Sequence, residues 1–132
     1  MKIRSGFVSN SSSSSFLLVG FKDKELWKII DQLGLSGISN IDDWEEREEL
    51  FRTAGFTDYG YGTFISKNRL VIVMDYDGIS CIGIEAEQLL NDGNNVKEIG
   101  KTVVQKLKEI SLNTDIDSDN ARVLSGTSSS EW

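Results

Sequence analysis

The sequence predicts an α+β protein in which a mostly antiparallel sheet is covered by helices. Segments that favour β-structure, joined by two tight turns, form a central meander at about 59–85. Segments with the 3.6-residue periodicity of amphipathic helices lie outside it, at about 23–33, 41–54 and 94–111. Adjacent strands with helices set apart from them are typical of the α+β class.

The first hairpin of the meander is predicted at Lys67-Asn68. These two polar residues separate the β-prone run Thr63–Ser66 from the apolar run Leu70–Met74, and Asn tolerates a positive φ. The second run is apolar throughout, which is typical of a strand covered on both faces. We therefore expect Leu70–Met74 at the centre of the sheet.

The second turn of the meander is predicted at Asp77-Gly78, because both central positions of a type I′ turn need a positive φ. Ile79–Glu85 then forms the third strand. Gly83 within this strand indicates a β-bulge or a close approach of two backbones. An isolated hairpin is barely stable in water, so the sheet needs further strands or a cover of helices.

The chain before the meander supplies one strand and a first helix. Phe16–Phe21 is an apolar run that we expect to pair with the central strands. The helix at 23–33 has Asp23 as its predicted N-cap, and Gly34 follows it at the position where a left-handed residue stops a helix. The apolar side chains of this helix are Leu26, Trp27, Ile30 and Leu33.

The helix at 41–54 has Asn40 as its predicted N-cap and Gly55 as its stop signal. Its apolar stripe is sparse and consists of Ile41, Trp44, Leu50, Phe51 and Ala54. Residues 55–62 are interpreted as a flexible, aromatic lead-in to the meander. They are not a nucleotide-binding loop, because a third Gly is missing and a strand follows.

The strongest helical pattern lies at about 94–111. One face carries Val96, Ile99, Val103, Val104, Leu107 and Ile110, and lysines lie elsewhere on the helix. We expect this helix to cover the sheet. Glu87–Asn95 before it is predicted to be a loop or short turn, and Ala121–Leu124 after it could add a final strand.

At 132 residues, the chain fits a single domain. The predicted organisation is a Ser-rich N-terminal arm at 1–15, one α+β domain at 16–126 and a polar tail at 127–132. No apolar run approaches the length of a membrane span. Serines stand where a signal peptide would need an apolar core, so we expect a soluble, cytoplasmic protein.

The composition excludes several kinds of chemistry. The absence of His removes Ser-His-Asp and Cys-His catalysis and the usual Cys/His zinc sites. The single Cys, Cys81, can form no disulfide within the chain and is expected to be a small buried side chain. The net charge of −7 argues against direct nucleic-acid binding, which needs clustered Lys and Arg. We predict no enzyme activity, no metal and no cofactor.

Carboxylates are the remaining candidates for catalysis or metal binding. Asp77 is accounted for by its turn and Asp75 by the end of a strand, although a deep pocket around the two would favour an enzyme. The alternating acids of Asp115–Asp119 are similar to the start of a calcium loop. The twelfth position of that pattern is Gly126, where calcium needs a bidentate Glu, so we interpret the segment as a polar loop.

The densest charge lies on the helix at 41–54. Its acids are Asp42, Asp43, Glu45, Glu46, Glu48 and Glu49, with Arg47 as the one base among them. One interpretation is a solvated helix face. The other is an acidic docking surface that imitates nucleic acid or meets a basic protein, and such an attraction would weaken as salt rises.

The N-terminal arm contains the string Arg4-Ser5-Gly6-Phe7-Val8-Ser9-Asn10-Ser11-Ser12-Ser13-Ser14-Ser15-Phe16. By composition, a serine run is a flexible linker, and its hydroxyls are also acceptors for phosphorylation. A bare linker explains neither of the flanking phenylalanines. The motif residues that we single out are Phe7, Ser9, Asn10, Ser11, Ser12, Ser13, Ser14, Ser15 and Phe16.

This string resembles the opening of a group of small uncharacterised proteins of tailed bacteriophages and prophages, which start with a Gly-Phe-Val-Ser-Asn-Ser-Ser-Ser-Ser-Ser-Phe type motif. Cys81–Glu85, followed by a Lys-rich amphipathic helix, is more loosely similar to the body of such proteins. The resemblance implies a phage-associated origin and brings no activity and no site residues with it.

The functional hypothesis is a phage-associated accessory protein that acts by binding a host or phage macromolecule, without catalysis. We expect the partner to be a protein and the acidic helix to be the surface that meets it. The alternative is a structural or assembly protein whose Ser-rich arm is a docking, processing or modification segment.

Overall fold

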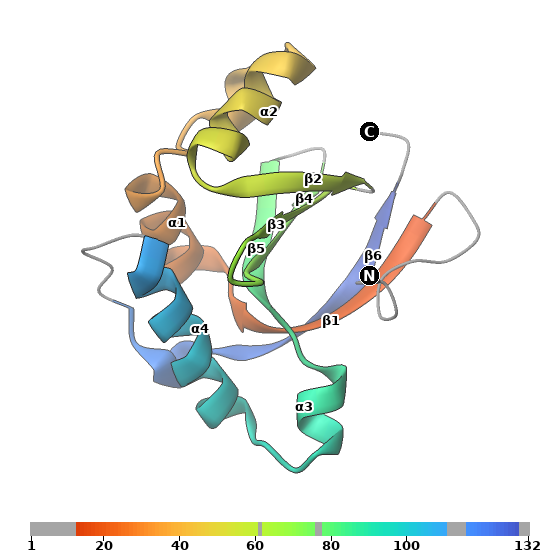
Figure 1. Ribbon diagram of the computed structural model, residues 1–132, viewed down its shortest axis with the longest axis vertical. Helices are drawn as coiled ribbons and strands as arrows, with labels where there is room; N and C mark the ends of the chain where they lie inside the picture. Colours follow the sequence, from red (N-terminus) through yellow and green to blue (C-terminus); the bar gives the residue numbers. More distant parts are fainter. Residues whose placement is uncertain (1–12, 61, 76–77, 111–115, 130–132) are drawn as a thin grey trace.

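The chain forms a six-stranded antiparallel sheet with helices packed against it, as a computed structural model shows (Figure 1). The structure describes residues 13–60, 62–75, 78–110 and 116–129. The strands are β1 Ser13–Phe21, β2 Phe56–Gly60, β3 Thr63–Ser66, β4 Val71–Asp75, β5 Gly78–Glu85 and β6 Arg122–Ser129, in the spatial order β2-β3-β4-β5-β1-β6. The predicted α+β class is confirmed.

Three helices lie where the periodicity placed them, with small shifts at their ends: α1 Asp23–Gln32, α2 Trp44–Thr53 and α4 Val96–Ile110. A fourth, the short α3 Glu87–Asn91, lies where a loop or short turn was predicted. Two 3₁₀ turns, η2 Ile38–Asn40 and η3 Ser118–Asn120, complete the described elements. α1 and α4 both contribute side chains to the main core, and α2 stands at the end near β2 (Figure 1).

The main core lies between the sheet and the helices. Its sheet side includes Phe21, Phe64, Ile72, Met74 and Ile82, and its helix side includes Leu26, Ile29, Phe51, Ile99, Val103 and Leu107. Helix α4 therefore covers the sheet as predicted. Each fully buried aliphatic side chain of this kind contributes roughly 1.5–3 kcal/mol before the loss of conformational entropy.

The opposite face of the sheet carries a second, smaller apolar cluster. It consists of Leu18, Ile65, Val71, Val73, Cys81 and Leu124, all buried. Strand β4 is thus covered on both faces, as its apolar run predicts, and Cys81 is the small buried side chain expected. The sheet curves so strongly that β6 comes near β4, although two strands separate them in the sheet order.

A glycine pair lets the backbones of β1 and β5 approach closely where the two strands meet. Gly20 is paired with Gly83. A Cβ at Gly20 would lie 2.0 Å from the carbonyl oxygen of Ile82, and a Cβ at Gly83 would lie 2.3 Å from that of Val19. The close backbone approach suggested by Gly83 is confirmed. The β-bulge lies elsewhere, between Val73 and Met74.

Both predicted turns of the meander differ in detail. Asp75 pairs with Gly78, so the β4–β5 loop is one residue earlier than Asp77-Gly78; Asp77 itself lies outside the described residues. The β3–β4 loop is longer than Lys67-Asn68 and is closed by a hydrogen bond from the Ser66 N–H to the Leu70 carbonyl. Within it, Arg69 adopts a φ of 76°.

The longer β3–β4 loop has a physical reason, because Asn68 is tied to α4. The Asn68 side-chain amide donates to the Lys106 carbonyl at 3.1 Å and to the Glu109 carboxylate at 2.8 Å. The Lys106 ammonium donates back to the Asn68 carbonyl at 2.6 Å. The two-residue turn was predicted from local sequence alone, which cannot reveal a contact with a helix distant in the chain.

The C-terminal end of α1 was predicted correctly and its N-terminal end was not. Its N-cap is Lys22, and Asp23 lies inside the first turn with a φ of 60°. Gly34 does stop the helix, with a φ of 76° and a hydrogen bond to the Asp31 carbonyl. Trp27 was predicted to be on the apolar stripe but is 62% exposed. The side chains of α1 that are buried in the core are Leu26 and Ile29.

Two further elements were predicted as irregular chain. Residues 56–60 form the edge strand β2, and residues 87–91 form α3. The predicted borders of the arm and of the tail fall inside strands, since Ser13, Ser14 and Ser15 pair with Ser129, Ser128 and Thr127. The final strand β6 exists and runs further than the predicted Ala121–Leu124.

The glycine pair gives a first prediction. Gly20→Ala places a methyl group against the backbone of β5 and should lower the free energy of unfolding by about 3 kcal/mol, the upper part of the range for overpacking. Urea unfolding followed by tryptophan fluorescence measures the loss. Thr57→Ala, at an exposed position of β2, is the control and should cost under about 1 kcal/mol. A Gly20→Ala variant as stable as the control would contradict the close approach.

Gly100 in α4 gives a second prediction. Helix propensity alone predicts that Gly100→Ala stabilises the protein by about 1 kcal/mol. A Cβ there would lie 2.5 Å from the Ala121 Cβ and 2.9 Å from the Ser118 carbonyl oxygen. We therefore expect destabilisation, by about 1–3 kcal/mol, measured by thermal unfolding. Gln105→Ala, on the exposed face of the same helix, serves as control, and a higher melting temperature for Gly100→Ala would refute the packing.

Candidate functional site

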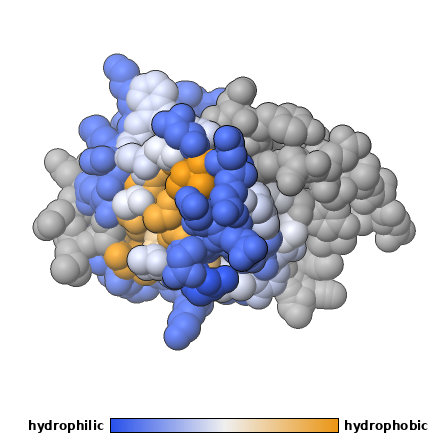
Figure 2. Space-filling view, turned by 90° about the horizontal axis from the view of Figure 1, so that it is seen from above, coloured by the Kyte–Doolittle hydropathy of each residue, from blue (hydrophilic) through white to orange (hydrophobic). Residues whose placement is uncertain are grey.

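The predicted acidic residues surround the start of α2, at the end of the molecule that Figure 2 views from above. Asp42 precedes the helix, and Asp43 is its N-cap, with its carboxylate accepting from the Glu45 N–H at 2.9 Å. Asn40, the predicted N-cap, belongs instead to η2. The cap moves because residues 41–43 are extended rather than helical.

The acidic side chains remain at the surface. Asp42, Asp43, Glu45, Glu46 and Glu49 are exposed, and Glu48 is half-buried. One ion pair is formed among them in the described chain, between Glu49 and Arg52 at 2.5 Å, and both partners are well exposed. Surface pairs of this kind are worth at most about 1 kcal/mol, so the segment keeps its negative field.

Arg47, the one base within the acidic run, contacts the backbone and, in the described chain, forms no ion pair with these acids. Its guanidinium Nε donates to the carbonyl oxygen of Ile41. This contact fixes the chain that enters α2. Sequence alone did not reveal this, since an Arg among six acids looks like a partner for them.

Trp44 adds an aromatic surface beside the acids. Its ring packs at a tilt against Phe64, with 6.2 Å between centroids, and it is still 38% exposed. Phe51 stacks on Phe64 at 3.7 Å and is the fully buried residue of α2. Trp44 lies two turns before Phe51 on the same helix face, so the pattern predicted it as part of the core. At the helix start this face extends past the sheet.

We use the name acidic surface for Trp44 together with Asp42, Asp43, Glu45, Glu46, Glu48 and Glu49. Figure 2 shows the end of the molecule that carries α2, where hydrophilic residues border a patch of more hydrophobic ones. An exposed Trp among anionic groups can provide both contact area and electrostatic attraction toward a cationic partner. Nothing in this arrangement requires a bound metal or a reacting group.

Part of the predicted arm motif can be located. Phe7, Ser9, Asn10, Ser11 and Ser12 lie outside the described residues. Ser13, Ser14, Ser15 and Phe16 belong to β1, and their backbones pair with Ser129, Ser128, Thr127 and Gly126 of β6. The arm motif and the acidic surface therefore belong to different elements, β1 and α2.

Among the carboxylates considered for catalysis or metal binding, Asp117 and Asp119 have other local roles. Asp75 ends β4 opposite Gly78. Asp117 accepts from the Asp119 N–H at 2.9 Å and caps η3, while Asp119 forms an ion pair with Lys97 at 3.4 Å. Asp115 lies outside the described residues. Among the residues that are described, no group of three or more His, Cys, Asp or Glu side chains is placed to hold a metal ion.

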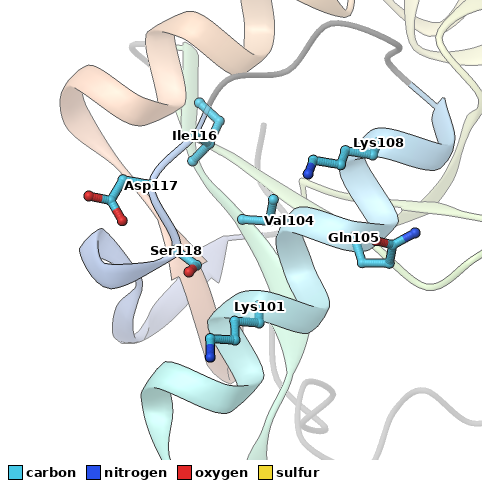
Figure 3. Close-up of a pocket in the computed structure, with 7 residues that line it drawn as sticks. All are labelled: Lys101, Val104, Gln105, Lys108, Ile116, Asp117 and Ser118. Carbon is cyan, nitrogen blue, oxygen red and sulfur yellow. The ribbon is translucent and has the colours of Figure 1, made fainter.

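A cavity of about 360 Å³ lies between α4 and the chain that leads into η3 (Figure 3). Val104 and Lys108 point from α4 toward the segment that carries Ile116, while Gln105 points away. Its size falls in the range of small-ligand pockets. Its rim offers Lys101 and Lys108, both exposed, and none of the described side chains that line it is both polar and buried.

Comparison of the chain with protein-family models, with curated proteins and with solved structures finds no match. The resemblance of Arg4–Phe16 to the opening of phage proteins therefore stays a prediction. A membrane-spanning helix would have to be both long and strongly apolar, and no helix of the described chain meets that requirement.

The cap of α2 separates the structural role of one acid from the rest. Asp43→Ala removes the acceptor for the Glu45 N–H and should lower the free energy of unfolding by about 1 kcal/mol, whereas Asp43→Ser should restore most of it. Asp42→Ala removes the same charge from the preceding residue and should leave the free energy of unfolding nearly unchanged. Chemical denaturation of the three variants tests this, and equal losses for Asp42→Ala and Asp43→Ala would disprove the capping role.

Proposed function

We propose that the protein is a non-catalytic accessory protein, phage-associated as its N-terminal string suggests, that binds a host or phage protein through the acidic surface. One observation carries this proposal: the acids of α2 remain exposed, and the base among them is committed to a backbone carbonyl. The partner of such a surface is a protein with a basic patch. If the chain is phage-encoded, its place of action is the host cytoplasm.

Electrostatic complementarity of this kind acts mainly on association rate and on the choice of partner. The attraction is screened by salt, with a Debye length of about 8 Å at physiological ionic strength. Binding through the acidic surface should therefore weaken steeply between low and physiological salt. Trp44 would supply the buried anchor that charges at a rim cannot, since Trp is enriched among residues that dominate binding energy.

The test compares two variants with the same change in charge. Glu45→Gln with Glu46→Gln neutralises two exposed acids of the acidic surface. Glu87→Gln with Asp92→Asn neutralises two exposed acids on and after α3 and is the matched control. Each protein is used to capture partners from infected-cell lysate, and recovered proteins are quantified by mass spectrometry. The proposal expects at least one protein that is recovered with the wild type and the control and lost with the α2 variant.

The Kd for the purified partner then shows how much the two acids contribute to binding. Neutralising both acids should raise Kd about tenfold at low salt, equivalent to about 1.4 kcal/mol, with a smaller effect at high salt. The control pair should change Kd by less than about twofold. A partner whose binding is indifferent to the α2 variant at every salt concentration would refute the acidic surface as the binding site.

A structural or assembly role for the Ser-rich arm is the second candidate. It is favoured by the ladder between Ser13–Ser15 and Thr127–Ser129, which joins the end of the arm motif directly to the sheet. Deletion of residues 1–12 leaves this ladder intact. Loss of partner recovery on this deletion, with recovery unchanged in the α2 variant, would favour the arm over the acidic surface.

A further inference from the structure

The two outer strands of the sheet differ in how their edges are protected. β2 is short, and its pairing with β3 is interrupted between Asp58 and Gly60. The Asp58 carboxylate accepts from the Gly60 N–H at 2.7 Å, and α2 packs next to the strand. Short length, an irregular register and an acidic side chain are devices that keep another strand from pairing with an edge.

The outer edge of β6 has none of these devices. Its register with β1 runs without a shift from Ser13↔Ser129 to Gly20↔Arg122. It contains no Pro, and its single charged residue, Arg122, stands at its first position. A long, regular and uncharged edge is a template for the addition of a further strand.

The alternation of hydrogen bonds shows which groups of β6 face outward. The Ala86 N–H donates to the Leu17 carbonyl at 3.1 Å, so the backbone groups of Leu17 are directed toward β5. Leu17 is paired with Ser125, which must then turn its N–H and C=O away from β1. Because the pattern repeats every second residue, Val123 and Thr127 face the same way. Within the described chain, no strand lies beyond β6 to accept these groups.

The outer part of β6 belongs to a ribbon of two strands. β5 pairs with β1 over Leu18–Phe21, whereas β6 pairs with β1 over Ser13–Gly20. β1 and β6 therefore run on together past the other strands (Figure 1). A two-stranded ribbon is marginally stable alone, so a further strand along β6 would stabilise this part of the sheet.

We infer that β6 is the edge at which two copies of this chain join their sheets, with β6 antiparallel to β6 of the second copy about a two-fold axis. A two-fold interface requires a surface that complements itself, and an antiparallel strand pair does so. Ser and Thr side chains are favourable cross-strand neighbours. The chain carries a net charge of −7, so copies repel one another, and residues 123–129 form a stretch without formal charge that adds nothing to this repulsion.

Sedimentation velocity over a range of protein concentrations tests the inference on the full chain. The wild type should sediment with twice the mass of one chain. Ser125→Pro removes an N–H that the ladder with β1 does not use, so the fold should persist and the dimer should be lost. Ser125→Ala keeps the N–H and is the matched control, which should remain dimeric. A monomeric wild type, or a dimeric Ser125→Pro variant, would overturn the inference.

Hydrogen exchange of the wild type decides the question even if the proline variant fails to fold. The amides of Val123, Ser125 and Thr127 should be protected wherever sedimentation finds a dimer and should exchange faster on dilution into the range where the dimer dissociates. Protection at a concentration where sedimentation finds a monomer means that these amides are paired within one chain, which would overturn the inference. Amides that are unprotected at every concentration would also overturn the inference. The edge would then be open to pairing with an extended segment of another protein. Either result leaves the acidic surface on α2 to be judged separately.

Discussion

The contact between Gly20 and Gly83 is the constraint on which the rest of the structure depends. β1 lies between β5 and β6, and at this point its backbone approaches β5 so closely that neither residue can carry a Cβ. The position of β1 sets that of β6, and the curvature of the sheet brings Leu124 into the second apolar cluster. A side chain at the crossing would displace β1 and loosen both cores together, since the strand contributes Val19 to one and Leu18 to the other.

α2 stands in contrast to this tightly packed region. It buries Phe51 fully, and a carboxylate cap, one guanidinium contact and the aromatic stack on Phe64 hold it in place. α4 buries five residues and is also tied to the β3–β4 loop. Charge can therefore accumulate on α2 with little cost to the core. Elements with few buried contacts open most readily, and such elements often carry binding surfaces.

The parts of the fold that sequence predicted are those that local pattern determines. The apolar run of β4 and the helical spacing of α4 depend on neighbours along the chain, and both were found. β2 was missed because Gly-rich chain becomes a strand only through its pairing with β3. The β3–β4 loop was misplaced because Asn68 is hydrogen-bonded to Lys106 of α4, which is 38 residues away in the sequence. For the acidic surface, composition indicated the residues but did not decide between a solvated face and a docking surface. The contact of Arg47 with the Ile41 carbonyl could not be predicted from the sequence.

The pairing of β1 with β6 also orders events during synthesis. A ribosome makes β1 first among the strands and β6 last, with every other described element between them. β1 can dock on β5 through the glycine crossing before β6 has emerged, but its opposite flank then waits for a partner. Nascent sheets with an open flank are prone to aggregate, and pairing across a long intervening chain is slow. Completion of the sheet is thus a late step in the life of this polypeptide, governed by the pace of translation as much as by the strength of its contacts.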